Sequence, residues 1–222
     1  MASRPMPVRQ YFIPGGAGKI EVAESSPETE SFLDRTAIAV IAHPHPLFGG
    51  TMDNKVVTTL ARAFYDIGAV VLRFNFRGVG QSEGVHDQGR GETGDLIAVV
   101  EHARVQFGAD VPLWLAGFSF GGAVALHATE RVACEQLVLV APAFQRLKLW
   151  SEGEAGRIAG GKPPARTVLI HGETDETVPL ADSFVWARGH DVPVVVIPGA
   201  DHFFHRKLHL IREVVMRMCR SP

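Results

Sequence analysis

Short apolar runs alternate with amphipathic stretches along most of the chain. The apolar runs have the length and hydrophobic continuity of strands buried on both faces of a sheet, and they lie at residues 36–42, 69–74, 111–116, 136–140, 166–170 and 192–197. The stretches between them repeat apolar residues every three or four positions, which predicts helices at residues 55–67, 92–107, 180–188 and 203–220. This alternation predicts an α/β fold with a mostly parallel central sheet and helices on both faces.

A different pattern precedes the first of these runs. Residues 8–13 and 19–23 have strand-like composition and flank the turn Pro14-Gly15-Gly16-Ala17-Gly18, which predicts an antiparallel N-terminal hairpin. Neither a repeat nor a flexible linker divides the 222 residues, so we expect residues 1–222 to form one domain with a core over about 8–220. The connection at residues 141–164 is too short for a large lid, which predicts a minimal cap or none.

Composition and charge narrow the possible partners. Hydrophobic residues make up 46% of the chain and the formal net charge is −2, with no long basic stripe for nucleic acid. The apolar runs are shorter than the roughly 18 residues of a spanning helix, and the first residues lack the apolar region of a secretory signal. Cys134 and Cys219 have no paired spacing. We therefore expect a cytoplasmic monomer or homodimer with no membrane span.

The most informative stretch is a Gly-x-Ser-x-Gly motif, Gly117-Phe118-Ser119-Phe120-Gly121. It follows the apolar run 111–116 and precedes the small-residue run 122–126, which packs closely only as a helix. Strand, sharp turn and helix in this order is the context of a nucleophile elbow, in which the serine hydroxyl is exposed at the top of a sheet. The alternative is a glycine-rich turn in which Ser119 only caps the helix.

Two further strands end beside residues with useful chemistry. Asp175 follows the run 166–170, and His202 follows the run 192–197. Because ligands bind outside the carboxyl ends of parallel strands, we expect Ser119, Asp175 and His202 on neighbouring loops at one edge of the sheet. A nucleophile, a carboxylate and an imidazole thus occur in the chain order Ser, Asp, His.

From about residue 8 to the C-terminus, the chain resembles the α/β hydrolases, and within them the small, cap-poor serine hydrolases similar to dienelactone hydrolase. The resemblance rests on residues 117–121, on the His-Gly-x-x-Asp-x-x-Val-Pro run at 171–179, and on 201–203. The segments 43–52 (His-Pro-His-Pro-Leu-Phe-Gly-Gly-Thr-Met) and 77–80 (Arg-Gly-Val-Gly) also resemble a bacterial group of such proteins. These motifs are specific for the fold and the serine mechanism and carry no information about the substrate.

The resemblance implies a role for each residue. Ser119 would be the nucleophile, His202 its general base, and Asp175 the carboxylate that orients the imidazole. One oxyanion-hole N–H would come from Phe120, the residue after the nucleophile. The second would come from His45, with Leu47 as the fallback, since the family's His-Gly-x pattern is His43-Pro44-His45 in this chain. No metal or organic cofactor is implied.

Aromatic side chains flank these loops, and we expect about half of them to pack only in the core. The candidates for an apolar acyl pocket are Phe48, Phe118, Trp150 and Phe203, with Phe120 and Phe204 as further members.

Other polar residues have more ordinary interpretations. His171 is expected to shape its loop, Asp201 to be a turn residue, and His205 to lie on the surface of the last helix. Arg77 and Asp53 either form an ion pair that braces the loops or are separately solvated.

Together these features favour a carboxylesterase-type serine hydrolase that acts on small or short-chain esters through an acyl-enzyme. A thioesterase or a small-amide hydrolase would use the same residues. Two other classes stay open at this point. One is a metal-dependent hydrolase, for which His43, His45, His171, His202 and His205 are available, although no His-Glu-x-x-His pattern supports it. The other is a non-catalytic binding protein on a hydrolase fold.

Overall fold

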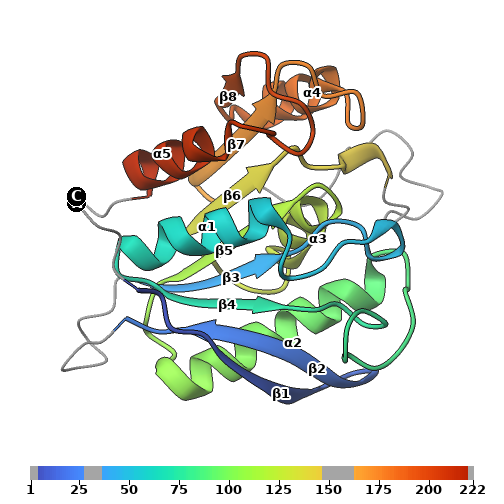
Figure 1. The fold of residues 1–222 in the computed structure, drawn as a ribbon, viewed down its shortest axis with the longest axis vertical. Coiled ribbons are helices and arrows are strands. Elements are labelled where there is room, and N and C mark those ends of the chain that lie inside the picture. The colour runs from blue at the N-terminus through green and yellow to red at the C-terminus, as the bar shows by residue number, and fades with distance from the viewer. Residues whose placement is uncertain (1–4, 28–36, 147–162, 220–222) are drawn as a thin grey trace.

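The computed structural model describes residues 5–27, 37–146 and 163–219. Within them, strands and helices alternate as the hydrophobic pattern predicts (Figure 1). The strands are β1 (Arg9–Gly15), β2 (Gly18–Ser25), β3 (Ile38–Ala42), β4 (Val70–Phe74), β5 (Leu113–Phe118), β6 (Gln136–Val140), β7 (Arg166–Gly172) and β8 (Val194–Ile197). The α-helices are α1 (Lys55–Asp66), α2 (Arg90–Phe107), α3 (Phe120–Ala128), α4 (Leu180–His190) and α5 (Leu208–Met218).

The strands form one sheet of eight in the order β1-β2-β4-β3-β5-β6-β7-β8. β1 pairs antiparallel with β2, and β2 with β4, whereas every other pair is parallel. The predicted sheet with its antiparallel N-terminal hairpin is thus confirmed. The chain leaves β3 toward β4 and returns on the other side of β3 as β5. The loops after β3 and β5 therefore diverge, and a crevice at this switch point is where open α/β sheets bind ligands.

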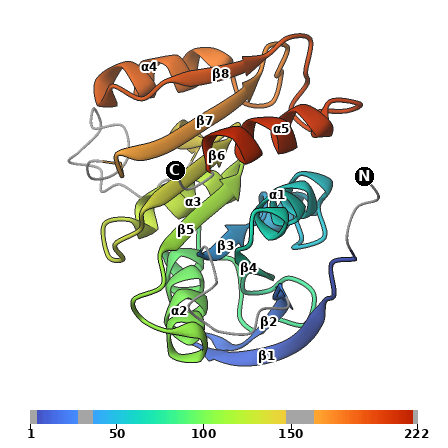
Figure 2. The same cartoon turned by 90° about the vertical axis from the view of Figure 1, so that its left-hand side faces the viewer.

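Helices cover both faces of the sheet, α1 and α5 on one and α2, α3 and α4 on the other (Figure 2). Two separate cores result. On β5, Trp114 and Phe118 pack in the core under α1 and α5, and Leu115 packs in the core under α2 and α3. This alternation follows from the two-residue period of a strand. None of the helices among the described residues is long and apolar enough to cross a membrane.

The C-terminal helix begins later than the sequence pattern predicts. It starts at Leu208 rather than at 203, and the preceding residues form turns. Asp201 holds these turns, because its carboxylate accepts the backbone N–H of His205 at 3.0 Å and lies 2.6 Å from its Nδ1. His205 is therefore exposed in a turn and not on the helix, and Asp201 is the turn residue that was expected.

Of the two alternatives left open for Arg77 and Asp53, a mutual ion pair and solvated side chains, the mutual pair does not form. Arg73 on β4 takes Asp53 instead, with 2.8 Å between Nη1 and Oδ1. The Arg77 guanidinium turns toward α2 and binds Asp95 with two contacts of 3.0 and 2.7 Å. Asp95 is almost fully buried, so its charge is matched inside the protein. Each of the two loops is consequently anchored by its own ion pair.

Candidate active site

Ser119 is the single residue between β5 and α3, and its backbone is strained. Its φ of 55° and ψ of −115° are values that a residue with a Cβ seldom adopts. The two flanking glycines are required, because a Cβ on Gly117 would meet the Gly121 backbone, and one on Gly121 would meet the carbonyls of Ala42 and His43. The strained peptide is fixed on both sides. Ser119 N–H donates to Val140 O at 2.9 Å, and Ala143 N–H donates to Ser119 O at 3.0 Å.

The Ser119 side chain does not cap the helix. Ser119 occupies the N-cap position of α3, but its hydroxyl makes no capping hydrogen bond. It lies instead 3.1 Å from His202 Nε2. His202 Nδ1 lies 2.7 Å from Asp175 Oδ2. The three predicted residues, which are 83 and 27 positions apart along the chain, thus form one hydrogen-bond chain from three strand ends.

Asp175 is held by donors on both of its oxygens. Oδ1 accepts the backbone N–H groups of Thr177 and Val178, each at 2.8 Å. Oδ2 faces His202 Nδ1 and, at 3.3 Å, His171 Nε2. Burial would raise the pKa of Asp175, but the hydrogen bonds from His171, His202 and Val178 outweigh it and hold this pKa well below its usual range. The carboxylate therefore stays ionised beside His202.

The two backbone N–H groups predicted for an oxyanion hole come from Phe120 and His45. Phe120 opens α3, and His45 precedes the short 3-10 helix η2 (Pro46–Phe48). Both residues line the same cavity as Ser119, and no hydrogen bond among the described residues uses either N–H. Leu47, the fallback, is wrong as a donor to the site. Its N–H donates to His45 Nδ1 at 3.2 Å, and the residue does not line the cavity.

The loop after β3 is braced from below by His43. Its Nδ1 donates to Pro44 O at 2.6 Å, and its Nε2 accepts the Phe76 N–H at 3.0 Å. Burial lowers the pKa of His43 to about 4, so the ring is neutral and keeps this tautomer. The contact with His43 Nδ1 uses the backbone carbonyl of residue 44, which proline keeps, and not the N–H that proline lacks.

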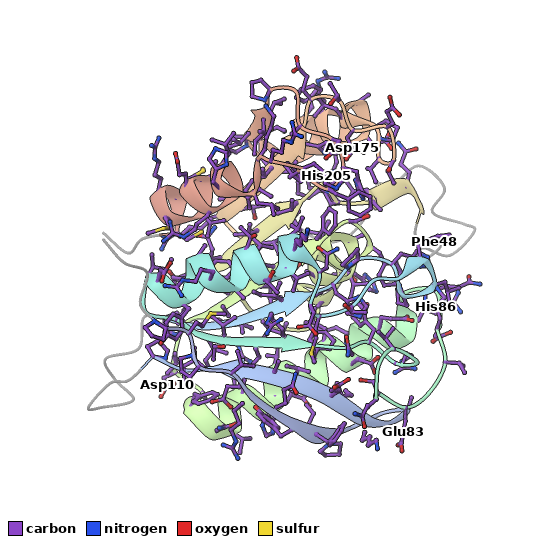
Figure 3. All side chains as sticks on the ribbon, viewed as in Figure 1. Phe48, Glu83, His86, Asp110, Asp175 and His205 are labelled. Carbon is purple, nitrogen blue, oxygen red and sulfur yellow. The ribbon has the colours of Figure 1, made fainter. Side chains whose placement is uncertain are left out.

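A cavity of about 520 Å³ opens over Ser119 and His202. Phe48 and Phe203 line it, as predicted, and so does Phe120. Sequence reasoning missed its remaining lining, which comes from Pro44, Gly49, Gly50, Asn54, Ala143, Thr177 and Val178. Figure 3 places Phe48 and Asp175 at the carboxyl ends of the strands, away from Asp110 at their other end.

Two of the predicted aromatic positions do not contribute to this cavity. Phe118 is fully buried and packs against the His202 ring with 4.9 Å between centroids, so it supports the imidazole from beneath and is wrong as a pocket residue. Phe204 is also fully buried and belongs to the core under α5. Trp150 lies outside the described residues.

A second group of side chains at this edge was not anticipated. The His86 ring contacts the His45 ring in a tilted arrangement, with 4.9 Å between centroids, and its Nδ1 lies 2.8 Å from Glu92. Glu92 is fully buried and also accepts the N–H groups of Asp87 and Gly89. From the sequence, Glu92 was visible only as an acidic residue in the first turn of a helix. Glu92 thus holds the loop before α2, and the His86 ring of that loop contacts His45; Figure 3 shows His86 and Phe48 near one another at this edge of the sheet.

The histidines of the metal-hydrolase alternative do not form a metal-binding group among the described residues. No group of three or more metal-binding side chains occurs among residues 5–27, 37–146 and 163–219. His43, His171 and His202 instead each use both ring nitrogens in separate hydrogen bonds.

Comparisons with known proteins agree with this geometry. The family model described as "Serine aminopeptidase, S33" matches residues 40–160. A Xanthomonas campestris structure, described as an α/β serine hydrolase without lid, is 36% identical, with 99% of each chain covered and a TM-score of 0.85. An α/β serine hydrolase homologue from Coxiella burnetii is 37% identical, with 97% of this chain and 99% of that chain covered and a TM-score of 0.80. A Rickettsia prowazekii protein named "Uncharacterized protein RP471" is 29% identical over 206 residues, which are 89% of this chain and 83% of that protein.

The matched family model spans more than half of the chain, and the two solved structures align with nearly all of it. The description of the Xanthomonas structure as lidless agrees with the expected minimal cap. The chain therefore belongs to the α/β-hydrolase family and is a serine hydrolase of that fold.

Proposed function

We propose that this protein hydrolyses carboxylic esters through an acyl-enzyme on Ser119. His202 takes the proton of the Ser119 hydroxyl as the oxygen attacks the ester carbonyl, and it returns that proton to the departing alcohol. Water then attacks the acyl-enzyme with His202 again as the base. Asp175 keeps the imidazole in the tautomer that accepts from serine and stabilises the imidazolium.

The observation that carries this proposal is the continuous hydrogen-bond chain from Ser119 through His202 to Asp175, open to a cavity beside two available N–H groups. An oxyanion formed on the substrate carbonyl would be stabilised by Phe120 N–H and His45 N–H. Removing one such donor typically costs about 2.7–4 kcal/mol of transition-state stabilisation.

The cavity supports a preference for small or short-chain acyl groups. Its volume of about 520 Å³ lies within the usual range of roughly 300–1,000 Å³ for small-molecule sites, and Phe48, Phe120 and Phe203 make part of its wall apolar. Thioesters and small amides pass through the same tetrahedral intermediate, so they are the other substrates that the site would accept.

The test is a panel of esters, thioesters and amides of increasing acyl length, measured with wild type and Ser119→Ala. Ester turnover by wild type should exceed that of Ser119→Ala by about 10³-fold or more. A fluorophosphonate should label the folded wild type and leave Ser119→Ala unlabelled. Equal turnover by the two proteins, or a folded wild type that is not labelled, would refute the serine mechanism and favour a non-catalytic binding role.

A metal-dependent mechanism makes the opposite prediction in a second measurement. Because His202 uses both ring nitrogens in the hydrogen-bond chain, we expect exhaustive treatment with a chelator to leave ester turnover unchanged. Loss of turnover that is restored by adding back a divalent cation would contradict the proposed mechanism.

A further inference from the structure

The Asp175 carboxylate lies between two imidazoles, and only one of them has a role in the mechanism above. His202 contacts Oδ2 at 2.7 Å from the side of the cavity. His171 approaches the same oxygen from the protein interior, with 3.3 Å from Nε2 to Oδ2. His171 is fully buried at the end of β7, so this contact is shielded from water.

The hydrogen-bond partners of His171 fix where its proton lies. Nδ1 is 2.8 Å from the Ser183 hydroxyl on α4, and Nε2 is 3.0 Å from Val178 O. A carbonyl only accepts, so Nε2 must carry the hydrogen, and Nδ1 then accepts from the Ser183 hydroxyl. The Nε2–H donates to Val178 O, and Asp175 Oδ2 lies 3.3 Å from the same nitrogen, close enough to attract the same hydrogen.

This arrangement completes the set of donors around the carboxylate. Thr177 and Val178 occupy Oδ1, while His202 and His171 occupy Oδ2. The same His171 N–H contacts the carbonyl of Val178, whose N–H binds Oδ1. His171 therefore braces both the carboxylate and the loop that carries it, and Ser183 connects the brace to α4.

We infer that His171 is a positioning residue for the hydrolytic reaction. Its Nε2–H holds the Asp175 carboxylate in the orientation that His202 requires, and Ser183 holds His171 in the tautomer that can donate. The inference rests on the proposed function, because it concerns how the same three residues are aligned. It assigns His171 no contact with the substrate.

Two amide substitutions separate this role from simple packing. In His171→Gln the longer side chain can place an amide N–H near the position of Nε2 and so keep the donor to Asp175. In His171→Asn the polar atoms reach only to the position of Nδ1, so Ser183 keeps a partner and Asp175 loses one. Both variants remain polar and lack the ring, and they differ in the partner that is kept: Asp175 in His171→Gln and Ser183 in His171→Asn.

The variants should differ in kcat on an ester that wild type hydrolyses. We expect His171→Gln to retain kcat within about threefold, and His171→Asn to lose about tenfold or more, as expected for a hydrogen bond to a charged group. KM should change little in either. If His171→Asn does not fold, Ser183→Ala tests the inference in its place. We expect it to lower kcat and leave KM unchanged.

A control variant accounts for general destabilisation. Val168→Ala truncates a buried side chain on the same strand without touching Asp175, so it should lower the melting temperature and leave kcat unchanged.

A readout independent of turnover is the low-field proton NMR resonance of His202 Nδ1–H, which should shift or broaden in His171→Asn and remain in His171→Gln.

The possible failures are distinguishable. A wild type with neither ester turnover nor fluorophosphonate labelling would refute the proposed function. An active wild type whose folded His171→Asn variant keeps wild-type kcat and an unchanged low-field resonance would overturn the inference about His171 alone. Equal losses in His171→Gln and His171→Asn would also overturn it, because packing of the ring would then explain both.

Discussion

At the scale of single residues, the site depends on imidazoles whose hydrogen-bond partners fix which ring nitrogen carries the hydrogen. His43 is the clearest case, because it supports the loop that carries His45 and has no contact with water. Burial lowers its pKa from 6.5 to about 4. Below pH 6.5 His43 is protonated in the unfolded chain but stays neutral in the folded protein. Acidification therefore favours unfolding until the pH reaches the pKa of His43 in the folded state.

This behaviour gives a prediction about stability and pH. The contribution of neutral His43 is complete above pH 6.5 and is lost as the pH falls toward 4, by about 3 kcal/mol in total. His43→Gln, which keeps an acceptor for the Phe76 N–H, should therefore show a shallower loss of unfolding free energy between pH 7 and pH 4. Urea titrations at a series of pH values measure this loss of unfolding free energy. His209→Gln, which replaces an exposed histidine, is the control. Parallel curves for His43→Gln and wild type would contradict the prediction.

The residues of the site divide into those that sequence could identify and those that it could not. Ser119, Asp175 and His202 each follow a strand almost directly, so the hydrophobic pattern alone places them at one edge of the sheet. Phe118 was misplaced because its direction depends on the two-residue period of β5, which points it beneath His202. His86 lies on an irregular loop, where no periodicity indicates that its side chain meets Glu92 on α2.

At the scale of elements, the ends of β7 and β8 must lie close for Asp175 to reach His202. Gly172 makes this possible, because a Cβ there would meet the carbonyls of Ala200 and Asp201. Both carbonyls belong to the loop that carries His202. The strand ends are further joined by the Thr174 N–H, which donates to Ala200 O at 2.9 Å.

A matched pair of glycine substitutions tests this packing. Gly172→Ala should push the two strand ends apart, lowering both the melting temperature and kcat. Gly189→Ala, in the exposed part of α4 where a Cβ meets nothing within 4 Å, should raise stability by up to about 1 kcal/mol and leave kcat unchanged. Thermal unfolding and ester turnover of the two variants measure both effects. A Gly172→Ala protein with full activity would show that the strand ends tolerate the extra atom.

Element types were predictable along the chain, and element boundaries were less so. α5 begins at Leu208 because Asp201 and the residues after it make a hydrogen-bonded turn, whereas their apolar spacing alone continues the helical pattern. Similarly, Arg77 and Asp53 have suitable charges for an ion pair with each other. In the folded protein, however, Asp53 pairs with Arg73, and Arg77 pairs with Asp95. Partner choice among charges requires the three-dimensional arrangement, which the pattern along the chain does not contain.

At the scale of the whole molecule, the sheet separates two cores that share the same strands. Trp114 lies fully buried in the core under α1 and α5, and Trp186 in the core under α2, α3 and α4. Each inner strand contributes alternate side chains to both. The two cores therefore depend on the same strands. If one core unfolded, one face of each shared strand would be exposed, and the other core would lose its support.

This shared sheet predicts cooperative unfolding of the expected single domain. Variants that keep only Trp114 or only Trp186, with the other tryptophans replaced by phenylalanine, report on opposite faces. Their fluorescence transitions in urea should coincide, each with the far-UV circular dichroism transition of the same variant. A fluorescence midpoint that departs from the circular dichroism midpoint would mean that the two faces unfold separately.

The strained backbone of Ser119 has a consequence for how this chain can evolve. A Cβ at φ 55° and ψ −115° costs about 1–3 kcal/mol, and this cost is independent of the hydroxyl. Ser119→Gly should therefore be more stable than Ser119→Ala by about 1 kcal/mol, in spite of the larger chain entropy of glycine in the unfolded state. Urea unfolding of the two inactive variants compares them directly, and equal midpoints would mean that the turn carries no such strain. A lineage released from selection for turnover would gain stability by replacing its nucleophile with glycine, so a serine at this position persists only while its hydroxyl is in use.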